Sequence, residues 1–186
     1  MGYLYSTIEA VKMLMEKHKV RSICDLGDQI NYTSHKQPEP YVSEWYKLFN
    51  VEYMSIDLNG NNDSKQWDMA EPIKTNKKFD LVVDAGFSEH VKDLYQCYTN
   101  IDKLTKVGGF VLHENPRTKN WPSHCRHYMD EKFHVDFAIQ SGYHIIELKN
   151  TVSAHNYETG NNVFCLYQKK KEGFIEREQF PQAYAI

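Results

Sequence analysis

The sequence predicts an α/β protein with a mostly parallel sheet that helices cover on both faces. Short apolar runs alternate with stretches of helical periodicity through about residue 140, and this alternation is typical of consecutive βαβ units. Two further apolar runs, 143–148 and 163–167, follow with no helical stretch between them. We therefore expect this last pair to form an antiparallel hairpin at the C-terminal edge of a doubly wound sheet.

Length and composition favour one globular domain. The chain has 186 residues, of which 41% are hydrophobic and 25% charged, so a sizeable core is expected. We place a single domain at 1–168 and a charged, loosely held tail at 169–186. The net charge of −3 gives no overall basic field that would draw the chain to nucleic acid.

The cysteines and the N-terminal segment favour a cytoplasmic location. The four cysteines are scattered, with no closely spaced pair, which is typical of reduced thiols rather than of a disulfide framework. No basic, then apolar, signal peptide is evident at the N-terminus, and no run approaches the ~20 apolar residues of a membrane span.

The first half of the chain is expected to alternate between helices and strands. A helix should begin at Ser6 or Thr7, whose hydroxyls can cap it, and strands should follow at about 22–26 and 51–57. Between these strands, the polar segment 31–40 contains two prolines, so we expect a loop that is either a substrate-facing lid or a surface insertion. A helix is expected at 41–49.

The second half continues the pattern. Asp130 should cap a helix that Gly142 ends, and Gly108 with Gly109 should form a sharp turn. The remaining expected elements are a strand at 79–84, a helix from about 89 to 104, a strand at 110–113, and loops at 115–128 and 156–162.

Acidic residues lie near the ends of three predicted strands. They are Asp25, Asp57 and Asp84, and Gly27 follows the first of them. Because parallel strands present their carboxyl ends on one edge of the sheet, where ligands bind in this class of fold, we expect the three carboxylates to share one rim. Asp57 could then accept hydrogen bonds from a ribose diol. A shared ligand site at this rim requires Asp57 to lie next to Gly27.

The order of these motifs resembles the class I S-adenosylmethionine-dependent methyltransferases, which have a Rossmann-like fold. The resemblance covers roughly residues 5–168, and no single motif is specific by itself. The segments that carry it are Asp25-Leu-Gly27, Ile56-Asp57-Leu58, Asp68-Met69-Ala70, Phe79-Asp-Leu-Val-Val-Asp84 with Glu89-His90-Val91, and Gly108-Gly109-Phe-Val-Leu.

The resemblance implies S-adenosylmethionine as the cofactor and a methyl transfer as the reaction. It implies that the methionine half is lined by Asp25, Gly27, Asp28 and Gln29, the ribose is held by Asp57, the adenine is flanked by Leu58 and contacted by Asp68 and Met69, and the site is closed by Asp84 and Ala85. The family loop usually carries a second glycine near position 29, where this chain has Asp28 and Gln29. Because of this difference, a non-catalytic binding or scaffold protein with this fold is the alternative.

The acceptor chemistry is weakly specified. His90, His113 and Glu114 follow or end predicted strands and are the candidate acid–base residues. A small-molecule acceptor is favoured over nucleic acid, because the pI is near 6.3 and the Asn/Asp-Pro-Pro-aromatic stretch is missing.

A metal is not expected from the sequence. His113, His124, Cys125, His127 and His134 are all chemically able to bind one. Their spacing fits neither a zinc finger nor an HExxH helix.

Overall fold

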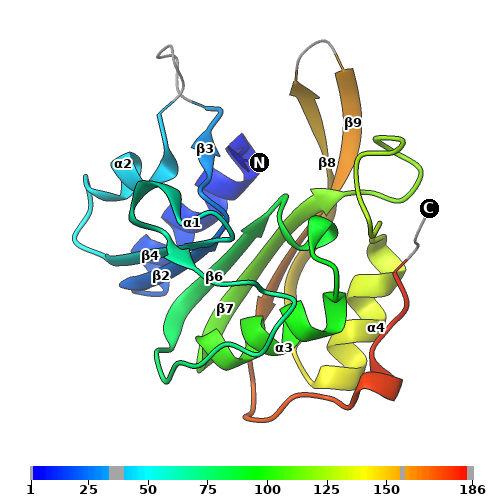
Figure 1. The fold of residues 1–186 in the computed structure, drawn as a ribbon. Helices are drawn as coiled ribbons and strands as arrows, with labels where there is room; N and C mark the ends of the chain where they lie inside the picture. Colours follow the sequence, from blue (N-terminus) through cyan, green and yellow to red (C-terminus); the bar gives the residue numbers. More distant parts are fainter. Residues whose placement is uncertain (1, 34–39, 156–157, 184–186) are drawn as a thin grey trace.

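Seven strands form one twisted sheet in the order β5-β4-β2-β6-β7-β9-β8 (Figure 1). The computed structural model describes residues 2–33, 40–155 and 158–183. Neighbouring strands from β5 to β7 pair in parallel, whereas β9 is antiparallel to both β7 and β8, so the predicted fold class is confirmed. The strands are β2 (Ser22–Leu26), β4 (Glu52–Asp57), β5 (Lys65–Gln66), β6 (Phe79–Ala85), β7 (Thr105–Pro116), β8 (His144–His155) and β9 (Glu158–Gln168).

Helices cover both faces of the sheet. On one face, α1 (Tyr5–Lys17) and the short α2 (Val42–Tyr46) pack over β2 and its neighbours. On the other face, α3 (Leu94–Leu104) and α4 (Glu131–Ser141) pack over β6, β7 and β9 (Figure 1). A small parallel pair, β1 (Gly2–Tyr3) with β3 (Ile30–Asn31), lies beside the first layer. Alternate residues of each strand therefore enter two separate apolar layers.

The helix ends agree with the sequence in one case and differ in another. The Asp130 side chain accepts from the Phe133 amide, and Gly142 ends α4 with φ 74°, as predicted. The expected cap at Ser6 or Thr7 is wrong, because α1 begins at Tyr5. Both hydroxyls instead donate to Glu114 of β7, so they attach the helix to the sheet.

Several element boundaries also differ from the predictions. The helix expected at 41–49 is only Val42–Tyr46. The helix expected from about 89 is interrupted, with a 3-10 turn at Ser88–His90 before α3. Gly108 and Gly109 lie inside β7 rather than in a turn that precedes it.

The final hairpin is longer than expected. Residues 158–162, placed in a loop by the sequence, belong to β9, which pairs with β8 up to His155 and Glu158. The segment 31–40, interpreted as a lid or an insertion, lies mostly outside the described residues, which resume at residue 40.

The C-terminal segment is held more firmly than the sequence indicated. The Lys169 side chain is fully buried and contacts Asp102 Oδ2 at 2.9 Å and the Asp102 carbonyl at 2.8 Å. Phe180 packs against Tyr98 and Phe133. The described part of the tail is therefore packed against α3 and α4. Within the described residues, no helix has the length and apolar character needed to cross a membrane.

Candidate cofactor-binding site

Gly27 and Asp57 are neighbours at the carboxyl ends of β2 and β4. The Gly27 amide donates to the Ile56 carbonyl at 2.6 Å, and the Asp28 amide donates to Asp57 Oδ2 at 3.2 Å. Gly27 has φ 86°, a conformation that a residue with a Cβ rarely adopts. The condition set by the sequence is met, because Asp57 lies next to Gly27 and its side chain remains partly exposed.

A cavity of about 380 Å³ opens beside Asp57. Four residues that the sequence assigned to the cofactor line it, namely Asp57, Leu58, Asp68 and Met69. Its other lining residues were not singled out for the cofactor: Asn59, Trp67, Phe87, His90, Val91, Lys92 and Arg126. Its volume lies within the ~300–1,000 Å³ typical of small-molecule sites. Apolar and aromatic walls with a carboxylate at one end suit a planar base joined to a diol.

Among the other cavity residues, Phe87 has a signal in the sequence and Arg126 has none. Phe87 directly follows β6 in the turn after Gly86, where loops over the carboxyl end of a parallel strand contact ligands. Arg126 comes from the long loop after β7, and its amide donates to the Glu89 carbonyl at 2.9 Å. That contact, between residues far apart in the chain, folds the loop back over the cavity.

Asp25 and Gln29 lie away from this cavity. Asp25 is 0% exposed, and its two carboxylate oxygens accept from the hydroxyls of Tyr3 and Tyr53. Burial raises the pKa of Asp25 to about 7, although the two tyrosine hydrogen bonds lower it. The Gln29 amide is also buried and donates to the Leu26 carbonyl. The Gln29 side chain is therefore bonded within the glycine turn, whereas the Asp25 side chain is bonded to Tyr3 and Tyr53.

Asp28 is the member of the turn that points outward. Its carboxylate accepts from the Asn62 side chain, which joins the turn to the loop after β4. Burial, and to a smaller extent the neighbouring Asp57, raises the pKa of Asp28. For Asp25, Gly27, Asp28 and Gln29, contact with the methionine half of a cofactor stays a prediction.

Asp84 is buried in the opposite core layer. It is 0% exposed and accepts from Ser88 Oγ at 2.5 Å, and its Oδ2 is 2.6 Å from His113 Nδ1. Burial would raise the pKa of Asp84, but His113 and Ser88 lower it below its usual value. Ala85, 2% exposed, packs in the α1 layer.

The expected common rim of three carboxylates is therefore wrong for Asp25 and Asp84. Asp57 lies at the edge of the sheet, whereas Asp25 and Asp84 are buried below it. Asp25 enters the layer of α1 and α2, and Asp84 enters the layer of α3 and α4. Asp25 is buried because it pairs with Ser55, two residues before Asp57 on β4. Asp84 is in the other layer because successive side chains of a β-strand point to opposite faces.

Of the three candidate acid–base residues, only His90 lines the cavity. His113 is 0% exposed and stacks on Tyr98, with ring centroids 4.8 Å apart. Glu114 points to the other face, where it accepts from Ser6, Thr7 and Thr151. In this arrangement His113 and Glu114 stabilise the two core layers.

Known proteins resemble this chain in structure. No family model matches the sequence, and no curated protein matches it. TehB from Haemophilus influenzae superposes with a TM-score of 0.58 and 14% identity. The match covers 90% of this chain and 63% of the TehB chain. NodS from Bradyrhizobium japonicum, an N-methyltransferase solved with S-adenosyl-L-homocysteine, gives a TM-score of 0.58 and 15% identity. The match covers 89% of this chain and 88% of NodS.

Two more solved structures show how far the likeness extends. BH2331 from Bacillus halodurans, solved as a candidate methyltransferase, gives a TM-score of 0.64 and 11% identity over 89% of this chain and 100% of its own. The [4+2]-cyclase SpnF gives a TM-score of 0.62 and 10% identity. The match covers 92% of this chain and 84% of SpnF. At these identities the likeness shows the fold, which is that of class I methyltransferases, and SpnF illustrates that one fold can support different chemistry.

Proposed function

We propose that this protein, which has the class I methyltransferase fold, transfers a methyl group from S-adenosylmethionine to a small-molecule acceptor. One observation carries the proposal: the Asp57 carboxylate lies next to the glycine turn and also lines the cavity formed with Leu58, Asp68 and Met69. A carboxylate at the end of the second parallel strand is the usual partner of a ribose diol in sheets of this kind.

The cavity residues fit an adenosine. Leu58 and Phe87 offer apolar surface for a planar ring. The Asp68 carboxylate, whose Oδ1 already accepts from the Ala70 amide at 2.8 Å, has a second oxygen for an exocyclic amino group. The two Asp57 oxygens accept from the backbone amides of Asp28 and Asn59. These bonds orient the carboxylate, and each oxygen can accept one more hydrogen bond, from a hydroxyl of a diol.

Methyl transfer from a sulfonium depends mainly on alignment. S-adenosylmethionine, when bound, supplies a methyl group that is already activated, so the chain has to hold the donor and orient the acceptor. Gly27 lets the main chain approach a ligand closely. His90, at the cavity, is the one candidate base placed to accept a proton from an acceptor that must lose one. A cytoplasmic location stays a prediction.

Calorimetry with S-adenosylhomocysteine tests the binding part of this proposal. We expect binding by the wild type and about 10- to 100-fold weaker binding by Asp57→Ala, because a hydrogen bond to a charged group contributes about 1.5–3 kcal/mol. Asp63→Asn is the matched control, since Asp63 is an exposed acid nearby that does not line the cavity. Its affinity should equal that of the wild type.

Methyl transfer is tested separately with labelled S-adenosylmethionine and a panel of acceptors. Transfer that Asp57→Ala reduces in parallel with binding supports the enzyme. Binding without transfer to any acceptor would favour the non-catalytic alternative. No binding at about millimolar ligand, which corresponds to ~4 kcal/mol of binding free energy, would reject the enzyme and leave the scaffold protein as the remaining alternative.

A further inference from the structure

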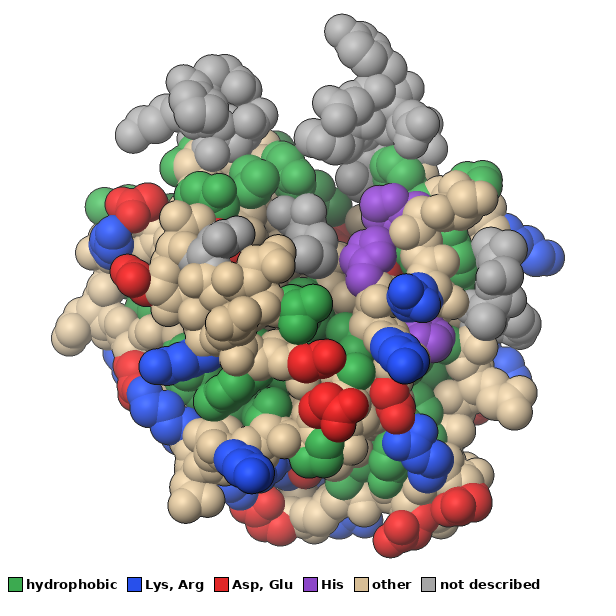
Figure 2. All heavy atoms as spheres, in the orientation of Figure 1, with side chains coloured by type: hydrophobic (Ala, Val, Ile, Leu, Met, Phe, Trp, Pro, Cys, Tyr) green, Lys and Arg blue, Asp and Glu red, His purple; other side chains and the backbone are tan. Residues whose placement is uncertain are grey.

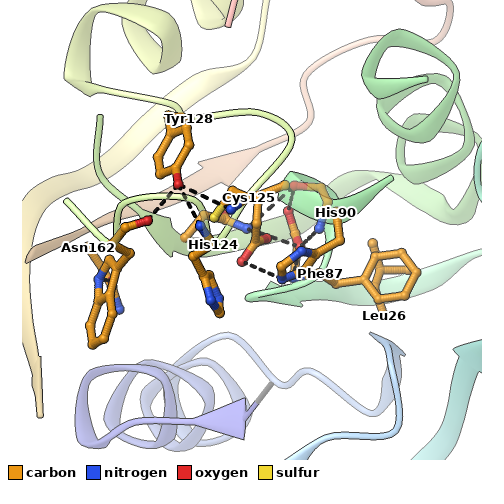
Figure 3. Close-up of polar contacts among 12 residues, drawn as sticks. Leu26, Phe87, His90, His124, Cys125, Tyr128 and Asn162 are labelled. Atoms are coloured by element: carbon orange, nitrogen blue, oxygen red, sulfur yellow. Dashed lines mark hydrogen bonds and ion pairs between the residues drawn. The ribbon is translucent and has the colours of Figure 1, made fainter. Parts of the chain in front are cut away.

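Three side chains that can bind a metal converge above the carboxyl ends of β6 and β7. They are Glu89 and His90 from the turn after β6, and His124 from the loop after β7. One ligand atom from each lies within 4.8 Å of the others. Figure 3 shows His90 and His124 in the two loops, and on the space-filled surface histidine side chains gather on this face (Figure 2).

Glu89 supplies an unsatisfied acceptor to this group. Its side chain is 1% exposed, and Oε2 accepts from Asn115 Nδ2 at 2.8 Å. Oε1 has no hydrogen-bond partner among the residues that the structure describes, and it lies 3.7 Å from His90 Nε2. A buried carboxylate oxygen without a donor is costly, and a cation held at this position would remove that cost.

The surrounding contacts hold the three side chains together. The amides of Arg126 and His127 both donate to the Glu89 carbonyl, at 2.9 and 3.0 Å, so the loop that carries His124 is attached to the turn that carries Glu89. The Tyr128 hydroxyl accepts from the amides of His124 and Cys125 and donates to the Trp121 carbonyl (Figure 3).

The orientation of the carboxylate is fixed in the same way. Asn115, fully buried in β7, binds the Oε2 side of Glu89 and leaves Oε1 facing His90. Outer groups of this kind commonly orient the residues that bind a metal. The His90 and His124 rings lie 5.1 Å apart, centroid to centroid, at 71°, so each can turn a ring nitrogen toward a common point.

We propose that Glu89, His90 and His124 bind one divalent transition-metal ion such as Zn²⁺ or Mn²⁺. Two imidazoles and one carboxylate suit these ions, whereas Mg²⁺ prefers oxygen ligands. Three protein ligands leave at least one coordination position open. The sequence predicted no metal because its spacing rules consider neighbours along one element, and this group joins two loops.

The site is next to the proposed active site. His90 contributes to both the metal group and the cavity, so an ion there would lie at the cavity edge and would occupy the His90 nitrogen that could otherwise accept a proton from the acceptor. Its open position would be available to an oxygen atom of the methyl acceptor. This last step rests on the proposed function, whereas metal binding itself does not.

Metal titration of the full chain, freed of metal with a chelator and carrying no His-tag, tests the site. Equilibrium dialysis with Zn²⁺, and with Mn²⁺ and Mg²⁺ in parallel, should give one transition-metal ion per chain with Kd below about 10 µM. Glu89→Gln and His124→Ala should each weaken binding at least about tenfold, as expected when a ligand is lost.

His127→Ala is the matched control. His127 lies in the same loop, but its Nε2 is 3.0 Å from the Val91 carbonyl, so its loss should leave Kd within about threefold of the wild type, a difference below ~0.7 kcal/mol. Circular dichroism shows whether Glu89→Gln folds. If it does not, His124→Ala still tests the site, because His124 is exposed and its replacement should not disturb the core.

Three results would overturn the proposal: no ion bound at the stated affinity, a loss below tenfold in His124→Ala, or an equal loss in His127→Ala. The measurements need no methyl donor. Failure to bind S-adenosylhomocysteine would therefore reject the proposed function and leave the metal site unaffected. Failure to bind a metal ion would reject the metal site and leave the proposed function unaffected.

Discussion

Asp25 and Glu89 are both buried carboxylates near the carboxyl end of the sheet, yet their surroundings differ. Asp25 lies under β1 and α2, where Tyr3 and Tyr53 donate to its two oxygens and the Tyr46 hydroxyl joins Tyr3 at 2.9 Å. Glu89 has one donor, Asn115, and one oxygen without a partner among the described residues.

The difference separates a structural acid from a candidate binding group. A buried carboxylate whose two oxygens both accept from neighbouring side chains stabilises one packing arrangement. Glu89 Oε1 has no donor among the described residues and lies 3.7 Å from Nε2 of His90, which lines the cavity. Burial raises the pKa of both groups, to about 7 for Asp25 and, together with the charge of Asp84, to about 8 for Glu89. The hydrogen-bond partners therefore distinguish the two sites, and the shifts do not.

The largest expected effect is the pH dependence of stability that Asp25 causes. The raised pKa means that the native state keeps this proton between about pH 4 and pH 7 while the unfolded chain releases it. The free energy of unfolding of the wild type should therefore fall, relative to Asp25→Asn, as the pH rises through this window, by up to about 4 kcal/mol.

Urea unfolding of both proteins at several pH values measures this difference. The sign follows from proton binding: the native state binds more protons than the unfolded state, so raising the pH favours unfolding. Parallel curves of unfolding free energy against pH for the two proteins from pH 4 to 7 would show that native Asp25 is ionised throughout. Asp25 would then not be the buried, proton-retaining acid with which Glu89 is compared.

A smaller effect is expected from Tyr53→Phe, which removes one donor from Asp25. The Tyr53 hydroxyl lies 2.9 Å from Asp25 Oδ2, and a hydrogen bond to a charged group contributes about 1.5–3 kcal/mol against about 0.5–1.5 for a neutral one. The loss of unfolding free energy should therefore be greater at pH 8 than at pH 5. An equal loss at both pH values would contradict a titrating Asp25.

The third effect concerns Asn115, which donates to Glu89 Oε2. Asn115→Ala should weaken Zn²⁺ binding about 10- to 100-fold by releasing the carboxylate from its orientation, and equilibrium dialysis measures it. Tyr53→Phe provides the control, because it alters the other buried carboxylate and should not change metal affinity. Equal affinities for Asn115→Ala and the wild type would mean that Glu89 is not positioned through Asn115.

The features that depend on local sequence were predictable. Apolar runs, Gly27 and the acids at the strand ends place β2, β4 and β6 correctly, and with them the proximity of Asp57 to Gly27. Asp130 and Gly142 mark the ends of α4 because their signals are local. These residues act through the backbone of their own segment, so periodicity and capping rules describe them.

The remaining features depend on contacts between distant segments. We predicted Asp25 at the rim because no residue near it in the sequence indicates that Tyr3 and Tyr53 will enclose it. Glu89 and His124 are brought together by loop contacts across β6 and β7, and the tail is held by the pairing of Lys169 with Asp102. Such pairs have no periodic signature and become visible only in the folded chain.

A crystal structure of the protein with S-adenosylhomocysteine is the decisive test of the proposed cofactor site. We expect the ribose hydroxyls within hydrogen-bond distance of the Asp57 carboxylate and the adenine in the cavity between Leu58 and Phe87. A ligand bound elsewhere, with this cavity empty and Asp57 still bonded only to the amides of Asp28 and Asn59, would contradict it.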